Sequence, residues 1–124
     1  MLYMEKETWA IRGAALEVHK ELGCGFLEEV YQEAMERELR LSGIPFEPQK
    51  QLELYYKGEL MTKYYKPDLI CYGEIIVELK AVSEIRPEHK AQVINYLKAT
   101  GKRMGMLINF GETSCKIHNL FFNK

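Results

Sequence analysis

The stretch from residue 75 to residue 80, IIVELK, constrains the fold of this chain more than any other. Successive side chains of a β-strand point to opposite faces, so one face of this segment is wholly apolar and must pack inward. That face carries Ile75, Val77 and Leu79. The opposite face carries an acid and a base, Glu78 and Lys80. The ordinary interpretation of such a pair is the solvated end of a strand.

The segments around this strand show first helical and then alternating apolar patterns. Two helices are predicted first, one ending at Leu22 before a glycine and one over residues 26–41. A β-hairpin is predicted over residues 52–65, and a short strand over 68–71 precedes the central one. A helix over 87–100 and strands over 104–110 and 115–122 complete the chain. This order predicts an α/β fold with a mixed central sheet flanked by helices.

Length and cysteine content set the class of protein. A chain of 124 residues is expected to form one domain, residues 1–124, that buries roughly two thirds of its unfolded surface. The cysteines, Cys24, Cys71 and Cys115, are odd in number and far apart, so we interpret them as reduced structural thiols. Residues 1–12 lack the continuous apolar run of a signal peptide or membrane span. We therefore expect a cytoplasmic protein with no membrane partner.

Charge is unevenly distributed along the chain. The whole chain has a formal net charge of −1. Residues 1–47 contain five basic and ten acidic residues, whereas residues 48–124 contain twelve basic and eight acidic residues. The second half is therefore the one suited to a polyanion, although charge segregation of this size is common in soluble domains.

Asp68 is the first residue that changes the interpretation of Glu78 and Lys80. It begins the strand before the central one, so it faces Glu78 if the two strands pair with residues 68 and 78 opposed. That register requires a loop of odd length or a bulge. A two-residue turn at Gly73-Glu74 pairs residue 68 with residue 79 instead.

Glu28 is the second such residue. At about 100° per residue it falls between Met35 and Leu39 on the apolar face of its helix. The other acids of this helix, Glu29, Glu33 and Glu36, fall on the opposite face, where water is expected. Glu28 is therefore predicted to point toward the site.

The helix over residues 87–100 adds polar groups. Gln92 and Tyr96 are four residues apart and so share one helix face. A buried tyrosine beside a glutamine is the ordinary interpretation of this pair.

Three carboxylates that converge repel one another, and a divalent cation removes that repulsion. Oxygen ligands suit Mg²⁺ or Mn²⁺, and the absence of Cys/His spacing argues against zinc. A lysine beside such an ion, here Lys80, has a use in phosphodiester hydrolysis, because it orients the attacking water and stabilises charge developing on phosphate.

These residues resemble two signatures. Pro67-Asp68 followed by Glu78-Leu79-Lys80 resembles the motif of the PD-(D/E)XK nuclease superfamily. The segment 25–31, GFLEEVY, resembles the GxxExxY signature of a small family placed in that superfamily. The resemblance runs from about residue 9 to residue 122.

The resemblance implies a restriction-endonuclease-like core of αβββαβ type and a role for each motif residue. Asp68 and Glu78 would be metal ligands and Lys80 the catalytic lysine, with Glu28 and the backbone carbonyl of Leu79 as further ligands. Supporting positions would be Gln92 and Tyr96, in a QxxxY element, together with Tyr31. The implied activity is nuclease cleavage dependent on Mg²⁺ or Mn²⁺, of DNA more than RNA.

Two other functions remain open from the sequence. The same fold serves as a binding module that holds nucleic acid or a protein without cutting. A purely structural role would satisfy the acids by ion pairs with Lys63, Lys66 or Lys80 and turn Glu28 to solvent. Aromatic residues near the termini, Trp9, Phe121 and Phe122, either cap the core or form a homodimer contact.

Overall fold

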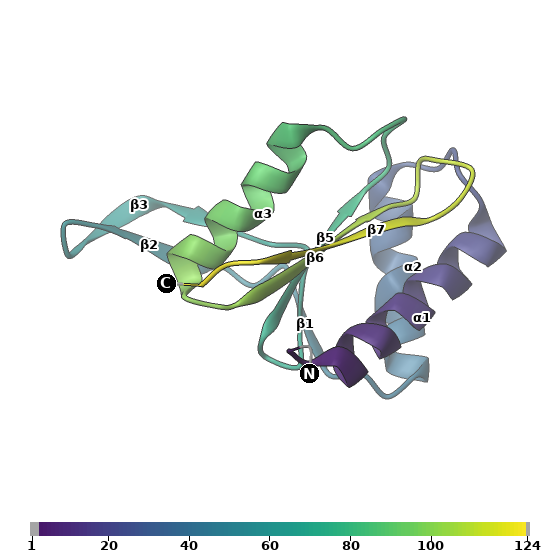
Figure 1. The fold of residues 1–124 in the computed structure, drawn as a ribbon, viewed down its shortest axis with the longest axis horizontal. Helices are drawn as coiled ribbons and strands as arrows, with labels where there is room; N and C mark the ends of the chain where they lie inside the picture. The colour runs from purple at the N-terminus through teal and green to yellow at the C-terminus, as the bar shows by residue number, and fades with distance from the viewer. Residues whose placement is uncertain (1–2, 124) are drawn as a thin grey trace.

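The computed structural model of the protein describes residues 3–123 (Figure 1). In chain order its elements are α1 (Glu5–Leu22), α2 (Glu28–Leu41), β1 (Phe46–Pro48), β2 (Leu52–Tyr56), β3 (Glu59–Tyr65), β4 (Leu69–Cys71), β5 (Ile75–Lys80), α3 (Pro87–Thr100), β6 (Met104–Asn109) and β7 (Lys116–Phe121). Five strands form one sheet in the order β1-β4-β5-β6-β7. Only the β5–β6 pair is parallel, so the predicted mixed sheet is confirmed.

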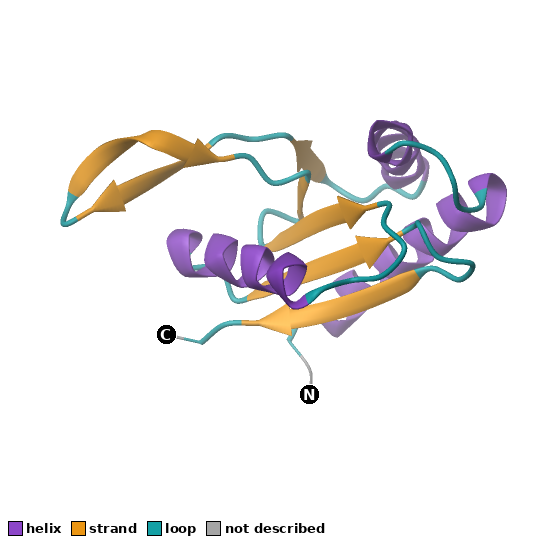
Figure 2. Cartoon of the chain, turned by 90° about the horizontal axis from the view of Figure 1, so that it is seen from above, coloured by secondary structure: helices purple, strands orange, loops and turns teal. Residues whose placement is uncertain are grey.

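Helices cover both faces of this sheet (Figure 2). Helices α1 and α2 pack on the face that carries Ile75, Val77 and Leu79, as the alternation of the strand predicts. Helix α3 covers the other face, where Tyr96 and Leu97 pack against Ile70 and Ile76. The face that carries Glu78 and Lys80 is therefore also covered by a helix and is not a wholly solvated surface.

The elements α2, β1, β4, β5, α3 and β6 follow one another as an αβββαβ core, and the β2–β3 hairpin is inserted between β1 and β4. The sequence predicted the hairpin but not its separation from the main sheet, and it missed the three-residue strand β1. So short a strand carries too few residues to show an alternating pattern.

The loop between β4 and β5 sets the register that the site depends on. The last hydrogen-bonded pair, Cys71 and Ile75, encloses three loop residues, 72–74. Tyr72 and Gly73 both have positive φ angles, 55° and 67°, and Glu74 N–H donates to Cys71 O at 3.1 Å. This odd-length loop satisfies the condition for Asp68 to oppose Glu78.

The aromatic residues near the termini and the cysteines differ in their exposure. Trp9 and Phe121 are 73% and 48% exposed, so they do not cap the core, whereas Phe122 packs beside the α3 cluster. All three cysteines are free, but only Cys71 is buried, and Cys24 is exposed. Within residues 3–123 no helix has the length and apolar content to cross a membrane.

Candidate active site

Asp68 and Glu78 face each other at the start of β4 and the end of β5. The pair Leu69 and Val77 fixes the register, which puts residues 68 and 78 directly opposite. Glu78 Oε1 accepts a hydrogen bond from Asp68 N–H at 2.8 Å, and Asp68 Oδ2 accepts one from Leu79 N–H at 2.8 Å. Each carboxylate therefore binds the backbone of the opposite strand.

Both carboxyl groups carry an electrostatic penalty. Glu78 is only 4% exposed, and this burial, with the negative charge of Asp68, raises its pKa to about 8. Burial also raises the pKa of Asp68, although the Leu79 N–H and the charge of Lys80 oppose the shift. Burial favours the neutral form of an acid, and a second carboxylate favours it further. The site is therefore short of positive charge.

Lys80 is a cation whose charge acts on all three acids. It follows Glu78 by two residues on the same face of β5, and its charge lowers the pKa of Glu78, Asp68 and Glu28. No ion pair within 4.0 Å joins a lysine to any of these acids in the described part of the chain. The ion pairs that the structural alternative requires are therefore not present among the described residues, although Glu28 is exposed, as that alternative expects.

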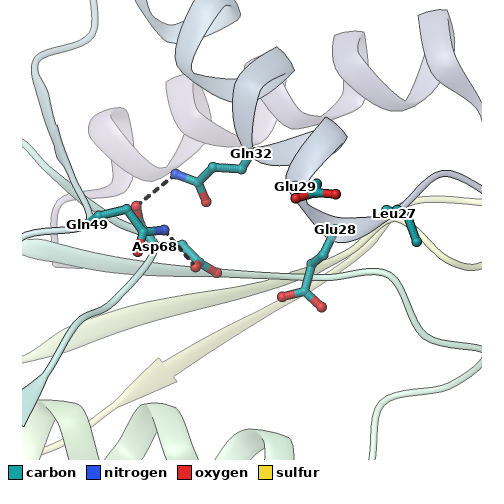
Figure 3. A pocket seen from close by; sticks show the side chains of 6 residues that line it. All are labelled: Leu27, Glu28, Glu29, Gln32, Gln49 and Asp68. Atoms are coloured by element: carbon teal, nitrogen blue, oxygen red, sulfur yellow. Dashed lines mark hydrogen bonds between the residues drawn. The ribbon is translucent and has the colours of Figure 1, made fainter.

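Glu28 is the first residue of α2 and lies at the mouth of the site. Its carboxylate points into the space beside Asp68 (Figure 3), where both residues line a pocket of about 450 Å³. Partial burial raises the pKa of Glu28, Lys80 lowers it, and Asp68 raises it, so these charges are within electrostatic reach.

The predicted burial of Glu28 on the apolar helix face was nevertheless wrong, because the residue is exposed. Helical spacing gives the direction of a side chain but not where the core ends. The core begins one turn later, at Tyr31, which is fully buried.

Tyr31 braces the loop that leads to Glu28. Its hydroxyl donates to Gly23 O and accepts from Phe26 N–H at 3.3 Å. Its ring stacks on Phe110 with 4.6 Å between centroids. Gly25 within this loop has a φ of 111°, a value that residues other than glycine rarely adopt. Tyr31 therefore contacts the loop and not the carboxylates.

Two glutamines that the sequence did not point to contact Asp68. Gln32 Nε2 donates to Asp68 O at 3.0 Å, and Gln49 Nε2 donates to Asp68 Oδ1 at 3.4 Å (Figure 3). Gln32 is one helical turn after Glu28, so the spacing contained a signal for it. Gln49 comes from the segment between β1 and β2, and no local pattern marks it.

Gln92 and Tyr96 form a pair on α3. Gln92 Nε2 donates to the Tyr96 hydroxyl at 3.2 Å. Burial, together with the charges of Glu78 and Asp68, raises the pKa of Tyr96 to about 12. Tyr96 is therefore a neighbour of the two carboxylates, and Gln92 reaches the site through it.

The donor atoms fit a hard divalent cation in kind. The candidates are carboxylate oxygens and the carbonyl of Leu79, and burial, which raises the pKa of Asp68 and Glu78, disfavours their charged forms when no cation is near. Pro67, opposite Leu79 in the register, has no N–H to offer that carbonyl. Among residues 3–123, however, no three His, Cys, Asp or Glu side chains are gathered to hold a metal. One oxygen of each carboxylate, Glu78 Oε1 and Asp68 Oδ2, accepts a backbone N–H, and each group has a second oxygen that could bind an ion.

Comparison with known families decides the assignment. The model of the PD-(D/E)XK nuclease superfamily matches residues 5–119. The chain belongs to this superfamily. PD-(D/E)XK nucleases generally use divalent metal ions, which agrees with the chemistry of the donor set. No curated protein sequence matches the chain significantly.

Two solved structures share the PD-(D/E)XK fold. SSO0001 superposes with a TM-score of 0.61 over 77% of this chain, at 16% sequence identity. An alkaline exonuclease from Laribacter hongkongensis superposes with a TM-score of 0.57 over 99% of this chain, at 10% sequence identity. The chain spans 50% of the length of SSO0001 and 73% of the exonuclease. At such identities the likeness is one of fold.

Proposed function

We propose that the protein is a metal-dependent nuclease that hydrolyses phosphodiester bonds of DNA in preference to RNA, and that it belongs to the GxxExxY group of its superfamily. The observation that carries this proposal is the opposition of Asp68 and Glu78 across β4 and β5, with Lys80 on the same face. An acid pair with raised pKa values beside a lysine and an open pocket is typical of a functional site.

Each residue has a distinct part in the proposed reaction. Asp68, Glu78 and the Leu79 carbonyl would hold the ion, and Glu28 would complete the ligand set from the start of α2. The bound ion supplies Lewis-acid polarisation of the phosphoryl oxygen and a more acidic water. The Lys80 ammonium orients the attacking water by hydrogen bonding and stabilises charge that grows on the phosphate oxygens.

The decisive experiment compares cleavage of single- and double-stranded DNA and RNA with Mg²⁺, with Mn²⁺ and with EDTA. Glu78→Gln is expected to lower cleavage by at least about 100-fold, because it removes one charged metal ligand. Glu74→Gln is the matched control, since Glu74 is an exposed acid in the loop before the same strand. Equal cleavage by wild type and Glu78→Gln contradicts the proposal.

A second arm separates chemistry from binding. Lys80→Met retains the three carboxylates, so it is expected to bind Mn²⁺ in calorimetry yet to cleave at least about 100-fold more slowly. Lys98→Met, at an exposed position of α3, controls for loss of positive charge. A wild-type protein that binds DNA in EDTA and cleaves no substrate supports the alternative, a binding module on a nuclease-like fold.

A further inference from the structure

The β2–β3 hairpin, residues 52–65, is called here the hairpin arm. It forms a separate two-stranded sheet and extends away from the five-stranded sheet (Figures 1 and 2). Its base is held by the body, where Tyr65 packs on Tyr96 with 4.5 Å between centroids and Leu52 packs on the same cluster. Such a contact matters because an isolated two-stranded hairpin is marginally stable in water.

The free part of the hairpin arm exposes large apolar side chains. Register pairs Tyr55 with Leu60 and Glu53 with Tyr64, with a shift of register between the two pairs. The Tyr55 hydroxyl donates to Glu53 Oε2 at 2.9 Å, so these side chains lie on one face of the arm. Tyr55, Leu60 and Tyr64 are 63%, 60% and 47% exposed. Tyr56 at 65% and Met61 at 42% are also exposed. Exposed apolar side chains gathered on one small element are typical of an interaction surface.

Lysines lie on the arm and flank it. Residues 52–65 contain two lysines and two glutamates, and the flanking Lys50 and Lys66 bring residues 49–66 to a net charge of +2, against −1 for the whole chain. Lys57, Lys63 and Lys66 make no ion pair within residues 3–123, and Lys57 Nζ lies 5.6 Å from the Tyr56 ring centroid. Tyrosine rings interleaved with unpaired lysines suit a ligand that has both flat rings and negative charge.

Both ends of the arm lead into the candidate active site. Asp68 follows β3 by three residues, and Gln49, three residues before β2, donates a hydrogen bond to Asp68. A ligand that lies along the arm is therefore continuous with the carboxylates and with the pocket beside Glu28.

We propose that the hairpin arm binds single-stranded nucleic acid, with unpaired bases stacked on Tyr55 and Tyr64 and phosphates near the lysines, and directs that strand to Asp68 and Glu78. The inference rests on the proposed function, because it names the substrate class of the same site. Stacking requires bases that are not paired, and aromatic platforms beside basic side chains bind single strands irrespective of sequence.

The test measures binding of a fluorescent oligothymidylate and of a duplex by anisotropy in EDTA. The double variant Tyr55→Ala/Tyr64→Ala is expected to weaken oligothymidylate binding by at least about tenfold and to change duplex binding less than twofold. Tyr55→Phe/Tyr64→Phe is expected to retain affinity, because the rings remain. Trp9→Ala is the control, since Trp9 is 73% exposed but lies on α1.

Three results overturn the inference. The first is an unchanged oligothymidylate affinity in the double alanine variant, with folding checked by circular dichroism. The second is an equal loss of affinity for duplex and single strand, which indicates backbone contacts alone. The third is a wild-type dimer in sedimentation that the alanine variant converts to monomer, because the arm then binds a second copy of this chain.

Failure of the arm and failure of the active site give different results. Hydrolysis of bis(p-nitrophenyl) phosphate with Mn²⁺ needs the carboxylates and Lys80. This substrate is too small to reach the arm. Wild-type hydrolysis that the alanine variant retains, together with weakened oligothymidylate binding, supports both proposals. Hydrolysis with unchanged binding overturns the arm alone. Binding through the tyrosines without hydrolysis overturns the proposed nuclease and leaves the arm as a nucleic-acid contact.

Discussion

Glu78 shows at the scale of one residue how the fold creates chemistry. Among residues 3–123 it is the only buried carboxylate, and its hydrogen bond from Asp68 N–H only partly offsets burial. A buried acid without an ion pair is costly, and a protein keeps one where the charge is later used. The raised pKa of Glu78 thus marks the position where a cation would restore charge balance.

This raised pKa predicts how stability depends on pH in the metal-free protein. The Glu78 pKa is 4.5 in its ordinary state and about 8 when folded, so the folded protein binds more protons between these values. The free energy of unfolding is therefore highest at low pH within this window and falls as pH rises from about 5 to 8, with a slope approaching about 1.4 kcal/mol per pH unit. The pKa values of Asp68 and Glu28 are also raised, so these acids add to the slope, whereas the charge of Lys80 reduces it.

Urea unfolding in EDTA at several pH values measures this slope. Glu78→Gln cannot lose a proton, so its curve is expected to be flatter over the same window. Saturating Mn²⁺ is expected to restore stability at pH 8, by about 2.7 kcal/mol at a hundred times its dissociation constant. Parallel pH profiles for wild type and Glu78→Gln would contradict the assignment of the slope to this residue.

At the scale of elements, the beginning of α2 and the loop before it act as one unit. Tyr31 lies one turn inside the helix and fastens the carbonyl of Gly23 and the amide of Phe26, while Glu28 extends from the first helical position. The spacing of glycine, glutamate and tyrosine in this segment therefore has a mechanical basis. The glycine allows the bend, the tyrosine fixes it, and the acid is held at the mouth of the pocket.

Tyr31→Phe tests this bracing. The variant keeps the stack on Phe110 but leaves the two backbone groups without their partner, which is expected to lower stability by about 1–3 kcal/mol. Because the loop before Glu28 loosens, Mn²⁺ affinity in calorimetry is expected to fall as well. Tyr72→Phe, at a half-buried tyrosine in the β4–β5 loop, is the control. A loss of stability with unchanged Mn²⁺ affinity would show that Tyr31 serves folding alone.

At the scale of the whole molecule, contacts between distant segments hold Lys80 in place. Asn109, at the end of β6, is fully buried and accepts from Val82 N–H at 3.0 Å while donating to Val82 O at 2.9 Å. Phe110 N–H donates to Lys80 O at 2.8 Å. The chain that follows the lysine is thus fastened to the neighbouring parallel strand, and Gly111 approaches it so closely that a side chain would collide with the Val82 backbone.

Gly111→Ala is expected to lower the free energy of unfolding by about 3 kcal/mol, the upper end for overpacking, because backbone atoms rather than a flexible side chain must yield. Gly13→Ala is the matched control, since a Cβ there meets nothing within 4 Å and α1 gains helix propensity of about 0.5–1 kcal/mol. Urea denaturation measures both. Equal stability of the two variants would show that the loop after Lys80 adapts freely.

Some of these features were already determined by the sequence alone. The alternation in residues 75–80 placed Glu78 and Lys80 on one face, Gly23 marked the C-terminal end of α1, and Pro87 marked the start of α3. These features depend only on residues close together in the chain, because the period of a helix or strand fixes which neighbouring side chains share a face. The mixed sheet followed from the order of such segments.

Only the tertiary structure decided what surrounds those residues. The left-handed conformations of Tyr72 and Gly73 set the register that places Asp68 opposite Glu78. The hydrophobic core does not extend to Glu28. Gln49 contacts Asp68 from a segment distant in the chain. The separation of the hairpin arm from the sheet also came from packing. Register, burial and long-range contacts depend on residues far apart in the chain, whose mutual distances no local pattern contains.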